Sequence, residues 1–313
     1  MILKIRDFFI KNNKNLGIWG WWQGKNLGDI WIKQSMIKAF EGASFIDTET
    51  PRKYFNQYGF IICGGGGLFI RDVHESWKEN IPVPFGVLGL GAEFKHKTTK
   101  ACELSRTAEF FFVRDKYSVE CMLLNPDSRS YDMTLFDPMP ALKEFNRDNV
   151  LLIWRDPDEL LRYKDFQEYI GLTTDIRAWQ KTIQDRFKRL SIDDFNTEYN
   201  YIEELTSHVG FVISARYHGI IAAIQRGVPC IGIDLCPKTR ALLNECGLSD
   251  FCLKLGEIDK LKDKIVQCFD EAKEIRQKQL LFVENARTKL EQDVSIARER
   301  INACQGRRER PKK

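Results

Sequence analysis

Short apolar runs alternate along the chain with longer stretches of helical periodicity. Strands are expected at 16–21, 60–63, 85–90, 110–113, 128–135, 149–155, 209–213 and 228–233. Helices are expected at 30–40, 160–170, 176–188 and 220–226, and the charged stretch 258–303 also has a helical pattern. Strands that alternate with helices in this way predict parallel sheets with helices on both faces.

A break in this pattern suggests two domains. The stretch 137–149 contains two prolines and many charges, which is typical of a linker. The length of 313 residues is enough for two ordinary domains. We therefore expect an N-terminal α/β domain over 1–145 and a second over 146–304 that includes the terminal helices. Residues 305–313 are expected to form a disordered basic tail.

Composition narrows the class of protein. A hydrophobic content of 43% and a charged content of 29% are globular values. The nine cysteines are scattered without a C-x-x-C pair, which favours reduced thiols and hence the cytoplasm over disulfides or zinc. The net charge of +4 comes from the tail, so the body is not a general nucleic-acid binder. The tail is either a solvated end or a weak contact with anionic lipid at the inner face of a membrane.

The segment Ser214 to Gly219 carries the strongest chemical signal. It lies between a predicted strand and a predicted helix, and it contains Arg216 and His218. Lys238 follows at the end of the next predicted strand. A helix N-terminus favours negative charge, and histidine exchanges protons near neutral pH. The pattern predicts a site for a small, multiply charged anion. The spacing of the histidines fits no metal site.

Three weaker clusters also follow predicted strands. The four glycines Gly64–Gly67 either pack strand ends tightly or face a substrate, and they match neither the dinucleotide pattern nor a Walker loop. Asp29 either caps the first helix or activates an acceptor hydroxyl. Arg114 and Asp115 form either an exposed ion pair or part of a binding site. Ligands of open parallel sheets bind at the carboxyl ends of the strands, where all these clusters lie.

Taken together, these segments resemble the polysaccharide pyruvyl transferase family. The resemblance covers roughly 15–250, and its most specific part is the block 214–248. The matching segments are Asn26-Leu27-Gly28-Asp29, Gly64-Gly65-Gly66-Gly67-Leu68-Phe69, Val113-Arg114-Asp115-Lys116-Tyr117-Ser118, Ser214-Ala215-Arg216-Tyr217-His218-Gly219, Gly227-Val228-Pro229, Pro237-Lys238 and Glu245-Cys246-Gly247-Leu248. Ala215 and Tyr217 replace the apolar neighbours that are commoner in the family.

The resemblance implies an α/β fold of two Rossmann-like domains facing across a cleft, similar to the GT-B glycosyltransferases. It implies transfer of pyruvate from phosphoenolpyruvate to a sugar of a surface polysaccharide or its lipid-linked precursor, forming a ketal. The N-terminal domain would take the acceptor and the second domain the donor. No cofactor and no metal are expected.

Roles follow for individual residues of the matching segments. His218 is the expected proton donor, and Asp29 is the candidate that activates the hydroxyl. The expected substrate-binding residues are Arg114, Arg216, Lys238, Asn26, Gly65, Gly66 and Ser214. The alternative function is that of a glycosyltransferase of the same architecture that uses a sugar nucleotide.

Overall fold

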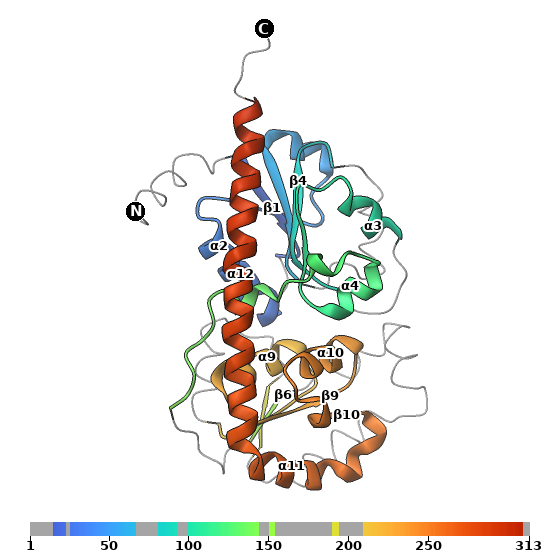
Figure 1. Cartoon of the computed structure of the whole chain (residues 1–313), viewed down its shortest axis with the longest axis vertical. Coiled ribbons are helices and arrows are strands. Elements are labelled where there is room, and N and C mark those ends of the chain that lie inside the picture. Colours follow the sequence, from blue (N-terminus) through green and yellow to red (C-terminus); the bar gives the residue numbers. More distant parts are fainter. Residues whose placement is uncertain are drawn as a thin grey trace. The chain divides into compact units, whose positions relative to one another are not determined.

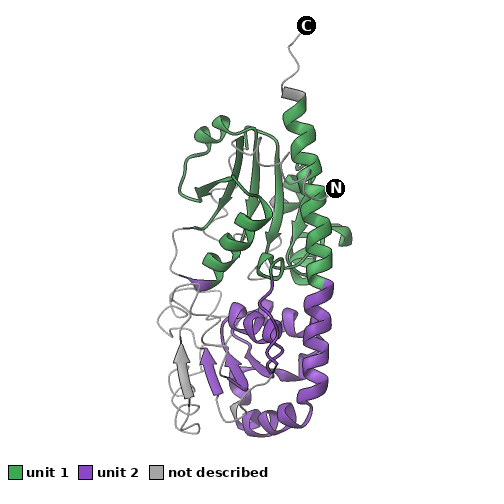
Figure 2. Cartoon of the chain, turned by 90° about the vertical axis from the view of Figure 1, so that its left-hand side faces the viewer, with its two compact units in different colours: residues 1–24, 28–137, 286–313 green, residues 25–27, 138–285 purple. Residues whose placement is uncertain are grey.

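The computed structural model describes residues 15–22, 26–66, 81–92, 99–143, 150–153, 190–193 and 209–308. The helices expected at 160–170 and 176–188 lie outside these ranges, as does Gly67. The chain divides into two compact units (Figure 2). Unit 1 comprises 1–24, 28–137 and 286–313, and unit 2 comprises 25–27 and 138–285.

Unit 1 is built on a five-stranded parallel sheet in the order β2-β1-β3-β4-β5. Its strands are β1 (Leu16–Gly20), β2 (Ser44–Asp47), β3 (Phe60–Gly64), β4 (Phe85–Leu90) and β5 (Phe111–Val113). Four of them match the predicted apolar runs. The pattern missed the edge strand β2, in which only Ile46 is buried. An edge strand with a single core position lacks the continuous apolar run of a central parallel strand.

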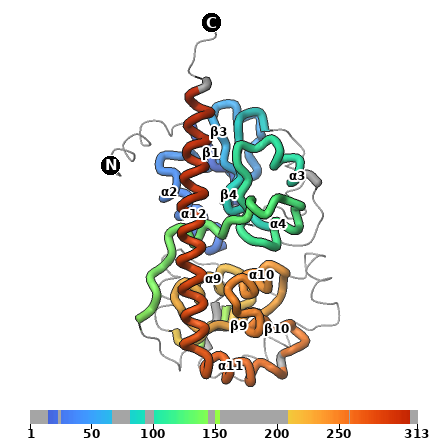
Figure 3. Tube along the Cα trace, viewed as in Figure 1, coloured from blue at the N-terminus to red at the C-terminus, as the bar shows by residue number. Residues whose placement is uncertain are grey.

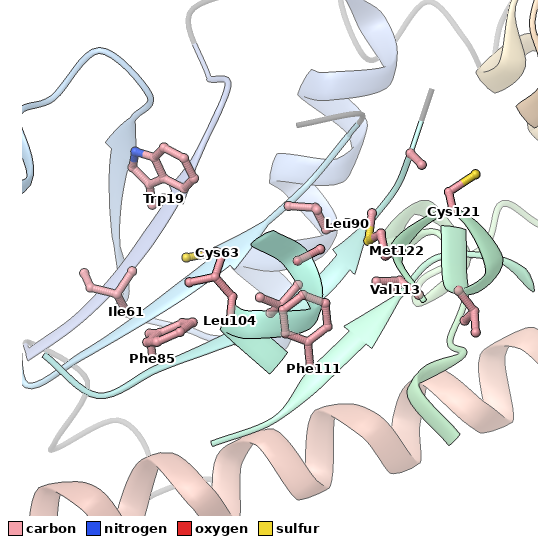
Figure 4. Packing of buried hydrophobic residues seen from close by; sticks show 14 of the residues in the cluster. Trp19, Ile61, Cys63, Phe85, Leu90, Leu104, Phe111, Val113, Cys121 and Met122 are labelled. Atoms are coloured by element: carbon pink, nitrogen blue, oxygen red, sulfur yellow. The ribbon is translucent and has the colours of Figure 1, made fainter. Parts of the chain in front are cut away.

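Helices cover both faces of this sheet. They include α2 (Leu27–Ala39), α3 (Thr99–Ser105), α4 (Lys116–Met122) and the later part of α12 (Ala272–Arg308), with a 3₁₀ turn η2 at Arg52–Gln57. Figure 1 shows α2 and α12 on one side of the sheet and α3 and α4 on the other. The core between the sheet and α3 and α4 contains Trp19, Ile61, Leu104 and Met122 (Figure 4).

The strand expected at 128–135 does not form. Two 3₁₀ turns occur here, Pro126–Ser128 and Met133–Leu135, and among the described residues an isolated bridge pairs Arg129 with Val113 of the sheet. Asp132 explains the turn, because its Oδ1 accepts hydrogen bonds from the N–H and the hydroxyl of Thr134. Such local side-chain bonds compete with a strand ladder.

Unit 2 contains a second five-stranded parallel sheet, in the order β10-β9-β8-β6-β7. Its strands are β6 (Val150–Ile153), β7 (Leu190–Asp193), β8 (Phe211–Ser214), β9 (Cys230–Ile233) and β10 (Cys252–Leu253). Its described helices are α9 (Tyr217–Arg226), α10 (Pro237–Glu245), α11 (Leu261–Asp270) and the start of α12. The tube in Figure 3 follows the chain through α9, β9, α10 and β10.

The two sheets share one topology. Numbered within its own unit, each has the strand order 2-1-3-4-5. The order reverses between the first and third strands, and ligands of open parallel sheets bind in the crevice at that reversal. The reversal lies between β1 and β3 in unit 1 and between β6 and β8 in unit 2. These two positions are therefore where the fold predicts binding.

The compact units differ from the expected domains at two boundaries. The units divide at 137/138, before the expected 145/146, because residues just after 137 pack on α9: Met139 N–H donates to Gln225 Oε1 at 2.7 Å and Leu142 N–H to the Arg226 carbonyl at 2.9 Å. The terminal helix also does not belong wholly to the second domain, because residues from Ala286 onward pack in unit 1.

The first residues of the expected tail are helical. Residues 305–308 continue α12 as helix, and the last five residues of the tail lie outside the described part of the chain. Within the described residues, no helix is both long and apolar enough to cross a membrane.

Candidate functional site

The turn after β8 is organised by Ser214. Its hydroxyl donates to the Arg216 carbonyl at 2.8 Å and accepts from the Arg216 N–H at 3.1 Å. The next residue ties the turn to β6, because the Ala215 N–H donates to the Ile153 carbonyl at 2.8 Å. A Cβ at Gly219 would lie 2.3 Å from Ser214 Oγ, so only glycine fits there. Ser214 is fully buried and uses its hydroxyl within the turn.

Helix α9 begins directly after this turn, at Tyr217, three residues before the predicted start at 220. Arg216 is its N-cap residue, with an extended backbone and no capping bond from its side chain. His218 therefore lies in the first turn and is not the cap, and its side chain is half-buried. The first turn contains no acidic residue. The positive end of the helix dipole is thus reinforced by a buried arginine.

Helix α10 repeats this arrangement on the neighbouring strand. Its N-cap residue, Cys236, makes no side-chain capping bond, Pro237 begins the helix and Lys238 follows in the first turn. Because β8 and β9 are adjacent and parallel, both helix N-termini lie at the same edge of the sheet. Arg216, His218 and Lys238 are therefore brought to one edge.

Three further residues organise this edge, and the sequence analysis did not assign them to the site. The buried carboxylate of Asp234, just after β9, accepts a hydrogen bond from Arg240 Nε at 2.8 Å. Arg240 thus compensates the negative charge nearest to α10. The ring of Tyr217 packs edge-on against the His218 imidazole, with centroids 5.2 Å apart, and Lys238 Nζ lies 5.8 Å from the centre of the same ring. In the sequence, the Asp234–Arg240 pair could have been recognised only from its spacing: Asp234 follows a strand, and Arg240 lies six positions later on the next helix.

In unit 1, the strand-order reversal lies beside Asp29 and the glycine turn. Asp29 lies in the first turn of α2, not at its cap, where a carboxylate is stabilised by the helix dipole. Gly65 and Gly66 follow β3 with φ of 88° and 71°. A Cβ at Gly65 would lie 2.8 Å from the Trp22 ring, and one at Gly66 would lie 3.0 Å from Asp29 Oδ1. Tight packing accounts for Gly65, while Gly66 lies beside the candidate carboxylate.

Asn26 directly precedes α2 and is half-buried. Asp29 and Gly66 lie in segments that follow β1 and β3, whereas the compact units group Asn26 with unit 2.

Arg114 has surroundings that the sequence did not predict. Its side chain is 1% exposed, and its Nε donates to Asp115 Oδ2 at 3.0 Å. The Asp132 carboxylate lies 3.9 Å from Nη1, and the Ala92 carbonyl accepts a bond from Nη2 at 3.4 Å. The ion pair with Asp115 is thus buried, and the exposed pair considered from the sequence is wrong. Two carboxylates and a carbonyl account for the burial of this guanidinium.

Metal ligands do not gather in the described part of the chain. No group of three or more histidine, cysteine, aspartate or glutamate side chains there is placed to hold an ion.

Comparison with solved structures shows the fold. A putative UDP-N-acetylglucosamine 2-epimerase from Listeria monocytogenes matches with a TM-score of 0.53 and 11% identity, over 90% of this chain and 95% of that one. The UDP-GlcNAc 2-epimerase from Neisseria meningitidis bound to UDP-GlcNAc matches with a TM-score of 0.50 and 11% identity, over 91% and 99%. The predicted fold class, two parallel α/β units of the GT-B kind, is confirmed.

Comparison of sequences shows the family. No curated protein matches the chain. A family model described as polysaccharide pyruvyl transferase matches residues 26–237, which include Asp29, the glycine turn and the turn from Ser214 to Gly219. This match spans more than half of the sequence, and the chain therefore belongs to the polysaccharide pyruvyl transferase family.

Proposed function

We propose that the protein transfers pyruvate from phosphoenolpyruvate to a sugar of a surface polysaccharide or of its lipid-linked precursor, forming a pyruvate ketal. The observation that carries the proposal is the pairing of two helix N-termini, α9 and α10, at one sheet edge with Arg216, His218 and Lys238. Phosphoenolpyruvate presents a carboxylate and a phosphate on a small frame. Two helix ends and two cations are complementary to two anionic groups.

The reaction needs one proton on carbon. The methylene carbon of the donor gains a proton and becomes the methyl group, and a sugar hydroxyl attacks the central carbon. The carbon–oxygen bond to phosphate breaks, and a second hydroxyl completes the ketal. Of the two hydroxyl protons, one balances the proton placed on carbon and the other leaves with the phosphate. We assign the proton transfer to His218, because it shares a helix turn with the anion-binding groups.

The acceptor residues are proposed around the start of α2 and in the glycine turn after β3. Asp29 would orient or deprotonate an acceptor hydroxyl, with Asn26 and Gly66 as neighbouring contacts. We leave Arg114 out of the donor site, because Asp115 and Asp132 already compensate its charge. A lipid-linked acceptor would place the reaction at the inner face of a membrane, where the basic tail would add a weak, salt-sensitive attraction.

Ligand-induced stabilisation tests the donor. Phosphoenolpyruvate at about 100 times its dissociation constant should raise the free energy of unfolding by about 2.7 kcal/mol. UDP-GlcNAc at the same concentration is the comparison, because the alternative function is a glycosyltransferase that uses a sugar nucleotide. Lys238→Met should greatly reduce the stabilisation, and Lys273→Met, which changes an exposed lysine of α12, is the matched control. Stabilisation by UDP-GlcNAc alone would favour the alternative.

The role of His218 is tested by turnover. His218→Gln keeps a hydrogen-bonding side chain but cannot transfer a proton, so kcat should fall by about 10²- to 10⁴-fold. Stabilisation by phosphoenolpyruvate should fall much less, because Arg216, Lys238 and the helix ends remain. A variant with wild-type kcat would show that the proton comes from another group.

A further inference from the structure

We propose that Tyr217 is a positioning residue that holds Lys238 and His218 in place for the donor. The inference rests on the proposed function, in which both of these side chains act. Tyr217 is the first residue of α9 and is only 6% exposed. Its ring contacts both His218, in the first turn of α9, and Lys238, in the first turn of α10.

The contact with Lys238 is a cation–π interaction. The ammonium nitrogen lies 5.8 Å from the ring centre, within the distance at which the negative face of an aromatic ring attracts a cation. A lysine side chain is long and flexible. A binding site that needs the lysine charge at one point therefore binds its ligand more weakly, because the free side chain must be ordered when the ligand binds. The buried ring reduces that freedom before the donor arrives.

The contact with His218 fixes the plane of the imidazole. The two rings meet edge to face, with centroids 5.2 Å apart and planes at 85°. Edge-to-face pairs are a favoured arrangement because the positive ring edge meets the negative face. A proton donor must keep its nitrogen in line with the accepting carbon. An aliphatic residue at 217 would fill the space but would exert neither attraction.

Substitution with partial rescue separates this role from simple packing. Tyr217→Leu should raise the KM for phosphoenolpyruvate by roughly 2- to 30-fold, the range expected for loss of a cation–π contact. It should also lower kcat, because the imidazole is no longer held. Tyr217→Phe keeps the ring and should stay near wild type. The matched control is Phe269→Leu, which removes an aromatic ring that packs on Phe211 in the same unit.

A second measurement covers the case in which Tyr217→Leu fails to fold. Incorporation of mono-, di- and trifluorinated phenylalanine at 217 weakens the negative face of the ring stepwise while nearly preserving its shape. The KM for phosphoenolpyruvate should rise with each fluorine in the wild-type background and stay level in a Lys238→Met background. A KM that does not depend on fluorination, or equal losses in Tyr217→Phe and Tyr217→Leu, would overturn the proposal.

A measurement without donor keeps the two proposals distinguishable. After reductive ¹³C-methylation, the Lys238 signal, identified by its absence in Lys238→Arg, should show a ring-current shift that disappears in Tyr217→Leu. If the wild type neither binds nor uses phosphoenolpyruvate while this shift is present, the proposed function fails and the placement of Lys238 by Tyr217 stands. If the shift is absent, the inference fails whatever the donor.

Discussion

Replacing Arg114 with alanine tests whether this side chain supports the fold of unit 1 or binds the donor. In the structure its guanidinium is enclosed, and the side chains of Asp115 and Asp132 are 4% and 0% exposed. Alanine at 114 would leave both carboxylates buried beside a cavity, without their cation. Removal of one partner from a buried ion pair costs about 3–5 kcal/mol, because the remaining charge is not compensated.

The expected loss is large enough to measure directly. A unit of this size shifts its melting temperature by about 2–4 °C per kcal/mol, so Arg114→Ala should lower the unfolding midpoint of unit 1 by roughly 6–20 °C. Differential scanning calorimetry or thermal unfolding followed by circular dichroism gives this midpoint. Arg106→Ala removes an exposed arginine of the same unit and should leave the midpoint nearly unchanged.

A charge-balanced variant separates the ion pair from the space that the side chain fills. Arg114→Met together with Asp132→Asn removes a cation and an anion at once, and it should recover much of the stability lost in Arg114→Ala. The reasoning is refuted if Arg114→Ala unfolds at the wild-type midpoint. A normal midpoint with a large loss of affinity for phosphoenolpyruvate would return Arg114 to the donor site.

Two further predictions concern buried groups. Burial raises the pKa of Asp293 in the folded chain despite its bonds to Lys289 and Ser130, so the folded state holds the proton more tightly than the unfolded state. The free energy of unfolding of the wild type, relative to that of Asp293→Asn, should therefore fall as pH rises above about 3.8. A difference between the two proteins in urea unfolding that stays the same at every pH would contradict this. Eight of the nine thiols are buried, and burial raises the pKa of Cys63 and Cys230 to about 12. In the native protein, Ellman's reagent should therefore react quickly only with the half-buried Cys102. Rapid labelling of more than one cysteine would contradict this and would show that buried thiols become exposed in the native protein.

The sequence alone predicted most of what local chemistry controls. The central strands of both sheets are continuous apolar runs because parallel strands are buried on both faces, and β4 was predicted to the residue. The position of His218 at a helix start also followed from local order, since a strand, a turn of small and polar residues and a helix come in direct succession. Because parallel strands end at one edge, the sequence could also predict that Arg216 and Lys238 approach each other.

Tertiary structure decided what depends on residues far apart in the chain. The burial of Arg114 needs Asp132, eighteen positions later, which a turn brings back to the end of β5. The terminal helix joins unit 1 because Arg298 donates to the Ala39 carbonyl, a contact that no local pattern indicates. The ring of Tyr217 reaches Lys238 only because β8 and β9 are neighbours in register. Helix and strand periodicity depend on a few consecutive residues, whereas charge compensation and ring contacts depend on how distant segments pack.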